Sequence, residues 1–531
     1  MLVVALLVAA PVTAVLVDAG RGEAPALPRN LGDMVVTTLL LMGGVGLGTS
    51  VLGVGLAWLV TAYAFPMRNL FVWLLVLPLA MPAYILGFVF LSTMNAAGPV
   101  QRSVRDLFGT DWAFSVSTLP GCIVVMSLTL YPYVYLMARS AFAEQAPTTY
   151  DAARTLGAGR RRAFFAVLLP LARPSLAAGL VLVMMEVLTD FATVQYFNVQ
   201  TVSVGVYLVW KGTYDFGSAA SLASLVMLFA VAVLAVERLL RGRARFTQRG
   251  GRGRGLPRTT LSPARGWAAA TVCLLALSGA FGIPVLRLGS WALGRALGDQ
   301  PSALGADFLD ALVNSAVVAA LAAVTCVTLA LVMGHALQLG GGRVVRGAAQ
   351  LTMFGYAVPG PVIAIGTLVL FAWADRALEA VGVPGGTGLL ATGSVVGILY
   401  AYAVRFLGPA YQAVDAAYAA VPASMTQSAL SLGAGPLRLL GRVHAPLVRS
   451  GLAVALVLVA IDAIKELPLV LLLRPFGFTT VSVSVYQLAK ENLWEQAAFP
   501  ALVIVALAMV PVFLLFRQVR ALDRLARREL P

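Results

Sequence analysis

Long apolar stretches recur from one end of this chain to the other. The stretch 34–64, for example, contains no charged residue. A helix needs about 20 apolar residues to cross a hydrocarbon core about 30 Å thick. Sixty per cent of the residues are hydrophobic and 11% are charged, whereas a typical soluble domain has about 25% charged residues. The chain is therefore expected to span a membrane many times.

The apolar stretches predict a fold class and a number of spans. They are continuously apolar, whereas the strands of a membrane barrel would alternate apolar and polar residues. We therefore expect an all-α polytopic membrane protein with about twelve transmembrane helices. We place the spans near residues 1–17, 34–64, 70–94, 117–138, 175–197, 217–237, 266–286, 312–336, 348–373, 389–407, 451–473 and 497–517.

The formal charge of +15 raises the question of a nucleic-acid partner, because basic surfaces bind phosphate. If both termini are cytoplasmic, however, most Lys and Arg residues fall in cytoplasmic segments, as the positive-inside rule requires. The charge therefore indicates topology in an inner membrane, and no nucleic acid is expected. The segment 238–265 is rich in Arg and Gly and is expected to be a flexible cytoplasmic linker.

The linker separates two similar halves. Leu156-Gly-Ala-Gly159 returns as Leu432-Gly-Ala-Gly435, and a segment ending at Tyr207 returns as one ending at Tyr486. We therefore predict two permease repeats, residues 1–237 and 266–531, with about six spans each. An even number of spans gives both repeats one orientation, related by an axis along the membrane normal. A solute path between the repeats is the natural hypothesis.

Each half contains a long polar loop between its fourth and fifth spans, near residues 148–174 and 424–450. The first reads Tyr150-Asp-Ala-Ala-Arg-Thr-Leu-Gly-Ala-Gly and continues to a Leu-Pro pair, and the second reads Thr426-Gln-Ser-Ala-Leu-Ser-Leu-Gly-Ala-Gly with an Ala-Pro pair. Glycine permits the turn between two short helices that such a loop requires. The bland alternative is an amphipathic loop that only lies on the membrane.

This pattern resembles the EAA loop of ABC importer permeases, and its occurrence twice strengthens the resemblance. The resemblance implies that each loop carries a coupling helix that docks on an ABC ATPase subunit. Asp151 replaces the usual Glu, and Gln427 lacks the acid, so one loop is expected to couple more weakly than the other. The coupling residues implied are Asp151, Ala152, Ala153, Gly157 and Pro170 in the first loop and Gln427, Ala429, Gly433 and Pro446 in the second.

The chain has no site of its own for ATP hydrolysis. Its three lysines are Lys211, Lys465 and Lys490, and none belongs to a GxxxxGK[ST] phosphate-binding loop. We therefore expect a transporter subunit without catalytic residues or bound cofactor, which uses ATP through a dimeric ATPase on the cytoplasmic side. A membrane enzyme would need a nucleophile with its base or a motif such as HExxH, and neither is present.

Acidic residues interrupt the fifth apolar span of each half. Glu186 and Asp190 are four residues apart, as are Asp462 and Glu466, so each pair is predicted to share a helix face near the membrane midplane. A charged side chain there costs about 2.5–3.5 kcal/mol unless it meets a partner or water. Two interpretations remain open. The acids flank a translocation path, or Lys465 neutralises a neighbouring acid and the cluster only joins helices.

The segments around these acids are similar to those of iron(III)-type permeases, notably Lys465-Glu-Leu-Pro and Leu473-Arg-Pro-Phe-Gly-Phe478. The resemblance spans nearly the whole chain and implies import of ferric iron, delivered by a periplasmic or lipid-anchored binding protein. Ferric iron is a hard cation that suits oxygen ligands. Thiamine is the alternative solute, with polyamines or anions behind it. A secondary transporter with two parallel repeats is the alternative of a different class, although it has no need of paired coupling loops.

No metal site is expected in the chain itself. The two histidines, His335 and His444, are predicted in different contexts, the end of a span and the second coupling loop, and are interpreted as structural. The three cysteines lie in apolar spans without a CxxC pair.

Overall fold

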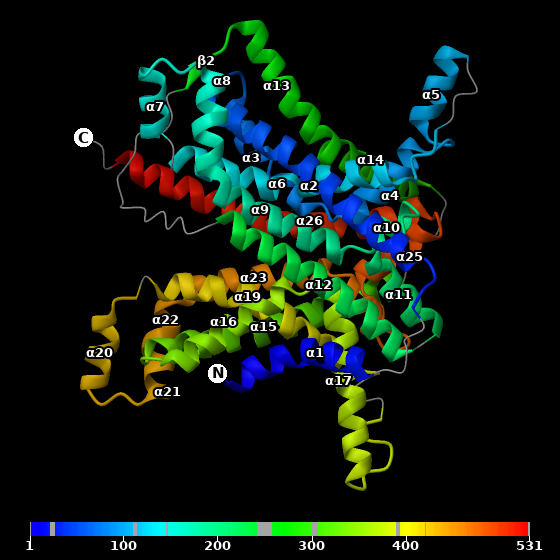
Figure 1. Ribbon diagram of the computed structural model, residues 1–531, viewed down its shortest axis with the longest axis vertical. Coiled ribbons are helices and arrows are strands. Elements are labelled where there is room, and N and C mark those ends of the chain that lie inside the picture. The colour runs from blue at the N-terminus through cyan, green and yellow to red at the C-terminus, as the bar shows by residue number, and fades with distance from the viewer. Residues whose placement is uncertain are drawn as a thin grey trace. The chain divides into compact units, whose positions relative to one another are not determined.

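The structure, a computed structural model, describes residues 2–21, 27–109, 114–144, 147–213, 215–241, 258–298, 306–388, 393–419 and 421–528. These residues are almost entirely helical (Figure 1). Turns and loops connect the helices, and two short strands, β1 (Tyr63–Ala64) and β2 (Thr259–Thr260), pair in parallel. Most of the expected linker, residues 242–257, lies outside the described residues.

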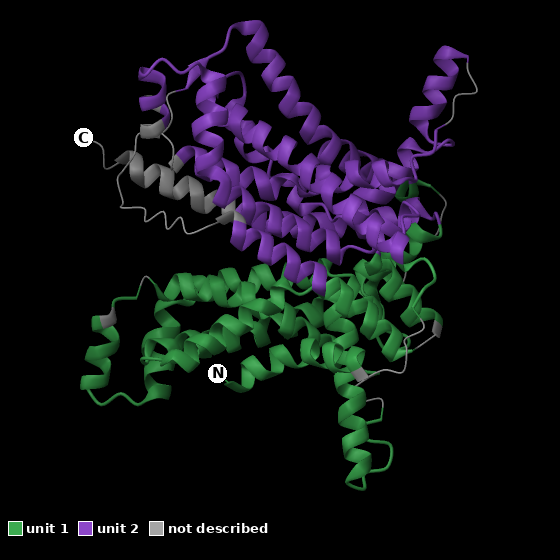
Figure 2. Ribbon diagram, viewed as in Figure 1, with its two compact units in different colours: residues 1–31, 202–227, 295–491 green, residues 32–201, 228–294, 492–531 purple. Residues whose placement is uncertain are grey.

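The chain divides into two compact units (Figure 2). Unit 1 comprises residues 1–31, 202–227 and 295–491. Its elements are α1 (Leu2–Arg21), α11 (Val202–Thr213), the first part of α12 (Phe216–Arg241), α15 (Ala306–Gln338), α16 (Arg343–Ala357), α17 (Gly360–Ala380), α19 (Val395–Tyr418), α20 (Ala423–Ser431), α21 (Pro436–Leu439), the π-helical η4 (Leu440–His444), α22 (Ala445–Leu447), α23 (Arg449–Lys465), α24 (Pro468–Leu473) and α25 (Val481–Lys490).

Unit 2 comprises residues 32–201, 228–294 and 492–531. It contains β1, β2 and the remainder of α12. Its further elements are α2 (Leu31–Ala62), α3 (Arg68–Leu74), the 3₁₀-helical η1 (Leu77–Ala80), α4 (Ala83–Met94), α5 (Pro99–Phe108), α6 (Leu119–Glu144), α7 (Pro147–Thr155), α8 (Arg160–Ala163), the π-helical η2 (Phe164–Leu168), α9 (Leu169–Thr189), α10 (Ala192–Tyr196), α13 (Pro263–Leu277), the π-helical η3 (Ser278–Gly282), α14 (Ile283–Leu297) and α26 (Trp494–Arg528).

The units interleave the two sequence halves. Helix α1, from the first half, packs against α16 and α17 of the second. Conversely, α13, at the start of the second half, packs against α3, and the final helix α26 packs against η1 and α4. The compact units are therefore not the sequence repeats, whose boundaries at 1–237 and 266–531 stay a sequence prediction.

Ten helices in the described part of the chain are long and apolar enough to cross a membrane, or eleven if one bent pair counts as a span. This confirms the all-helical polytopic class and lowers the expected number of about twelve. Of the expected span 389–407, residues 395–407 lie in α19, which does not count among the ten and carries a buried Arg405, and residues 389–392 lie outside the described residues.

Proline breaks two of the expected spans at equivalent places. The stretch 70–94 is interrupted at Pro82, the N-cap of α4, and the stretch 348–373 at Pro359, the N-cap of α17. Proline lacks the backbone N–H and its ring clashes with the carbonyl four residues before it, so a helix ends there. The spacing between these prolines is nearly the spacing between Gly157 and Gly433. Both sequence halves therefore have a proline break at the same position, which the length of the apolar stretches did not predict.

Candidate functional site

The first candidate coupling loop is a helix, a turn and a second helix. Helix α7 ends at Thr155, and Gly157 follows with φ +88°. The Gly157 N–H donates to the Arg154 carbonyl (3.1 Å) and the Ala158 N–H donates to the Ala153 carbonyl (3.0 Å). These two bonds are the Schellman pattern, which requires a left-handed residue after the helix. Helix α7 is therefore ended by hydrogen bonds from the N–H groups of Gly157 and Ala158.

The second loop has the same geometry. Helix α20 is followed by Gly433 with φ +77°. The Gly433 N–H donates to the Leu430 carbonyl (3.0 Å) and the Ala434 N–H donates to the Ala429 carbonyl (3.0 Å). Gln427 lies within α20 and Ala152 lies within α7. Asp151 lies on α7, but its side chain is outside the described residues.

The prolines of the two motifs follow π-helical segments. Pro170 comes just after η2, and Pro446 comes just after η4. A π-turn widens the helix, because its hydrogen bonds join residues five apart. This accommodates a proline, which has no N–H and whose ring clashes with the carbonyl four residues before it. The copies differ beyond this point. In the second copy, the segments Pro436–Leu447 and Arg449–Lys465 meet at a bend of 77°, whereas Arg160–Thr189 forms one candidate span.

An exposed leucine precedes the turn in each loop. Leu156 and Leu432 occupy equivalent positions, and each side chain is 88% exposed. A single exposed leucine is ordinary on a protein surface, but here the exposure recurs at the same position of both turns. These two residues were not among the predicted coupling residues, although both belong to the repeated Leu-Gly-Ala-Gly string.

The junction between each coupling helix and its unit differs in chemistry. In unit 2, Tyr150 of α7 packs edge-on against Trp58 of α2, with ring centroids 6.0 Å apart. Trp58 also contacts Phe142 and Phe164. Since these residues are all aromatic, α7 packs on an apolar cluster.

In unit 1 the corresponding junction is a buried chain of hydrogen bonds. Thr426 of α20 lies 3.1 Å from Nε2 of His444, and Nδ1 of His444 lies 2.8 Å from Nδ1 of His335 on α15. Tyr418, which stands at the position equivalent to Phe142 of the first copy, packs edge-on against the His444 ring. His335 lies in the last turn of α15 and His444 lies in the second loop, as predicted, but the fold brings the two rings together, with centroids 4.9 Å apart.

The acids of unit 2 do not share one helix face, contrary to the prediction. Helix α9 ends at Thr189, and Asp190 is extended with ψ +98°. Its carboxylate accepts the Thr193 N–H (2.9 Å) and the Thr193 hydroxyl, so it caps the short helix α10. Glu186 lies half-buried in the last turn of α9 rather than in its middle.

The acids of unit 1 repeat this break. Helix α23 ends at Lys465, and Glu466 is extended with ψ +125° and accepts the Leu469 N–H (3.4 Å), capping α24. Glu466 Oε2 also lies 3.3 Å from Nε of Arg405, and both side chains are buried. Lys465 pairs with Asp462 at 2.7 Å, and these side chains are 34% and 27% exposed.

Asp462 and Glu466 are therefore both neutralised, but by different cations. Lys465 neutralises Asp462, as one of the two open interpretations supposed. Arg405, which neutralises Glu466, was missed, although an arginine inside the apolar stretch 389–407 was a visible signal. Among the described residues, no group of three or more His, Cys, Asp or Glu side chains is placed to hold a metal ion.

Residues 49–245 and 326–528 match the family described as the binding-protein-dependent transport system inner membrane component. The chain is 25% identical over 496 residues to the Fe(3+)-transport system permease protein FbpB 2 of Haemophilus influenzae, covering 92% of this chain and 90% of that protein. It is 33% identical over 147 residues to the molybdenum transport system permease protein ModB of Escherichia coli, covering 28% of this chain and 63% of that protein. It is also 28% identical over 208 residues to the sulfate transport system permease protein CysT of Escherichia coli, covering 37% of this chain and 72% of that protein. With two matched segments that together cover more than half of its length, the chain belongs to the family of binding-protein-dependent transport system inner membrane components.

Proposed function

We propose that this permease imports ferric iron. The observation that carries the proposal is the likeness to an Fe(3+)-transport permease over 92% of this chain and 90% of that protein. The likeness to the molybdenum and sulfate permeases covers 28% and 37% of the chain. A likeness that extends through both halves is the better guide to the solute, because the path is expected between the two repeats.

As a member of its family, the chain is the multi-pass inner-membrane permease of an ABC importer and leaves ATP hydrolysis to another subunit. Its family implies an ATPase and a binding protein as partners. We propose that α7 and α20 are the coupling helices on which an ATPase dimer docks. The support is their matching Schellman turns and the exposed Leu156 and Leu432. Both termini then lie on the cytoplasmic side with these loops.

We propose that Glu186 lines the solute path. Among the described residues, Asp462 and Glu466 have cationic partners and Asp190 caps a helix, whereas no ion pair involves Glu186. A half-buried carboxylate without a cationic partner needs water or a passing cation to remain charged. The helix breaks at Asp190 and Glu466 also support this proposal, because non-helical backbone at membrane depth is tolerated where it is buried in protein or lines a cavity.

The test is ATP hydrolysis in proteoliposomes that contain this permease, its ATPase and its binding protein. We expect the iron-loaded binding protein to stimulate hydrolysis and to drive uptake of radioactive iron. Binding protein loaded with thiamine, molybdate or sulfate serves as the comparison. Stimulation by one of these and not by iron would replace the solute and keep the importer. A failure of the ATPase to associate with the permease would contradict the coupling proposal.

A further inference from the structure

Unit 1 contains a cavity of about 560 Å³ at the end opposite to the second coupling helix. In Figure 1, α20 lies at one end of α23, and α24 and α25 lie at the other. The cavity is bounded by α11, α25 and the segment that joins α24 to α25. Its volume is within the range of about 300–1,000 Å³ that small-molecule sites occupy.

The two sequence repeats contribute equivalent residues to this cavity. Helix α11 supplies Tyr207 and Lys211, and α25 supplies Tyr486 and Lys490, with the members of each pair four residues apart. The two tyrosines end the repeated segments that the sequence shows, so the two lysines are also equivalent. Residues four apart lie on one helix face, so each helix presents a tyrosine and a lysine to the same side. A hydrogen bond joins the side chains of the two tyrosines. The cavity thus has a floor built by both repeats.

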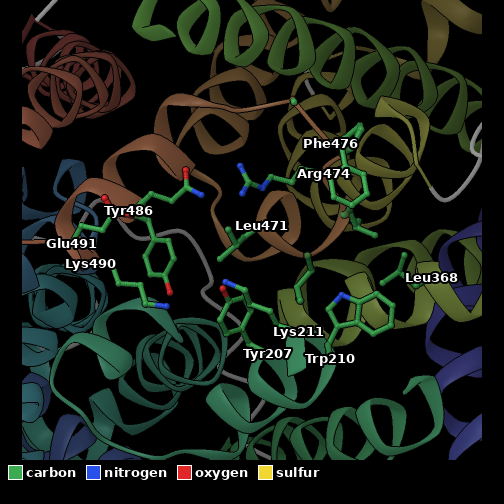
Figure 3. A pocket seen from close by; sticks show the side chains of 15 residues that line it. Tyr207, Trp210, Lys211, Leu368, Leu471, Arg474, Phe476, Tyr486, Lys490 and Glu491 are labelled. Atoms are coloured by element: carbon green, nitrogen blue, oxygen red, sulfur yellow. The ribbon is translucent and has the colours of Figure 1, made fainter. Parts of the chain in front are cut away.

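Three cationic side chains line the cavity. Arg474, from the segment after α24, joins Lys211 and Lys490, and Figure 3 shows the three side chains pointing into the same space. Among the described residues, Glu491 is the one carboxylate that lines the cavity. In the described part of the chain, none of the three cations is ion-paired with a carboxylate.

Other contacts of these cations leave their charge uncompensated. Lys211 Nζ lies 5.8 Å from the centre of the Tyr207 ring, and Arg474 donates to the Thr479 hydroxyl at 3.3 Å. Burial lowers the pKa of Arg474, but a guanidinium stays protonated in proteins. Three like charges around one cavity repel each other, and this repulsion is relieved when an anion enters. Two of the three lysines in the whole chain lie here, which adds weight to the arrangement.

We propose that this cavity binds a small oxygen-rich anion, which Lys211, Lys490 and Arg474 hold by charge-assisted hydrogen bonds. The guanidinium suits the two oxygens of a carboxylate or an oxyanion, and each ammonium supplies a point charge. Trp210 gives the cavity an apolar wall. The anion enters either free or as a ligand of ferric iron, since a hard cation is carried by oxygen donors. Binding of the free anion does not depend on which solute the importer carries, whereas entry as a ligand of iron rests on the proposed ferric-iron import.

The experiment measures anion binding to the purified full-length chain in lipid nanodiscs, without ATPase or binding protein. Radioactive sulfate, citrate and ferric citrate are the probes. We expect saturable binding that weakens as salt rises. Lys211→Gln and Lys490→Gln should each weaken binding about tenfold, by the loss of one charge-assisted hydrogen bond. The double variant should weaken binding about a hundredfold if the two losses add.

Arg346→Gln is the matched control, because Arg346 is an exposed cation of unit 1 on α16, outside the cavity lining. It should bind the anions as tightly as the unaltered chain does. The thermal unfolding of each variant is measured as well, and only variants as stable as the unaltered chain are compared. Tighter binding of ferric citrate than of citrate indicates an anion that enters with iron, and the reverse indicates a free anion. The proposal is overturned if none of the three probes binds saturably, or if the double variant binds as well as Arg346→Gln. Neither result touches ferric-iron import, which is measured in the complete importer.

Discussion

Arg405 and Glu466 form a buried ion pair that joins α19 to the end of α23, with Nε and Oε2 3.3 Å apart. Arg405 also donates to the Val358 carbonyl at 3.2 Å, just before the proline break between α16 and α17. Glu466 caps α24 with its other carboxylate oxygen. One ion pair therefore fixes three helix ends in unit 1.

Glu466→Gln should destabilise the chain strongly. It leaves the Arg405 charge buried without an anion, which costs about 3–5 kcal/mol for buried pairs. Thermal unfolding of the purified chain in detergent measures the effect. Asp462→Asn is the matched control, because its pair with Lys465 is partly exposed and such pairs contribute about 0–1 kcal/mol. Equal losses in both variants would contradict the structural role of the buried pair. The double variant Arg405→Met/Glu466→Met should recover part of the stability.

Gly157→Ala and Gly433→Ala should each weaken the coupling of ATP hydrolysis to transport. Their φ angles of +88° and +77° cost an L-residue about 1–2 kcal/mol. No atom lies within 4 Å of an added Cβ at either position, so backbone strain alone is introduced. Gly159→Ala and Gly435→Ala are the controls, since neither has a positive φ and both have the same open space. If the control variants lost as much coupling as Gly157→Ala and Gly433→Ala, the left-handed turn would not be the cause of the loss. The lost acid at Gln427 predicts that the Gly433 variant loses less activity than the Gly157 variant.

Leu156→Ser and Leu432→Ser should weaken association with the ATPase and leave the chain folded. Burial of a leucine at an interface contributes about 1.5–3 kcal/mol, or about ten- to a hundredfold in affinity. A pull-down with the purified ATPase reports the loss. Leu297→Ser is the control, because this leucine is 80% exposed and lies at the end of α14, outside both loops. Unchanged ATPase binding in the Leu156→Ser/Leu432→Ser double variant would exclude these leucines from the interface.

His444→Leu should loosen the second coupling helix. Leucine stands at the equivalent position of the first copy, Leu168, so the size of the side chain suits the π-helical segment. The substitution removes the partner of His335 Nδ1 and of the Thr426 hydroxyl, and an unpaired buried polar group costs about 1–3 kcal/mol. Thermal unfolding measures this loss. His335→Leu/His444→Leu should be more stable than His444→Leu alone, and the opposite order would contradict the hydrogen-bonded junction.

Glu186→Gln should lower ferric-iron uptake in the complete importer while the thermal stability stays near that of the unaltered chain. The side chain is half-buried without an ion pair among the described residues, so removing its charge breaks no structural contact of that kind. Radioactive iron uptake and basal ATP hydrolysis, measured together, separate transport from assembly. Full uptake in this variant would take Glu186 out of the path.

Much of the candidate coupling site could be predicted from local sequence. The sequence Leu-Gly-Ala-Gly is typical of a helix C-terminus, because glycine adopts the left-handed conformation that ends a helix. The first glycine of each copy has this conformation. The acids were predicted less well. Asp190 and Glu466 end their helices because their side chains cap the next ones, and capping competes with helix continuation in a way that apolar periodicity does not report.

The sequence by itself determined the membrane location, the all-helical class, the twofold repeat and the two loops, since these depend on hydropathy and on spacing along the chain. Only the tertiary structure decided that α1 and α13 each pack with the opposite half, that Arg405 meets Glu466, and that His335 meets His444. It also brought Lys211 and Lys490 to one cavity. The physical reason is that apolar periodicity shows which residues avoid water, whereas pairing between distant polar side chains depends on how the helices pack.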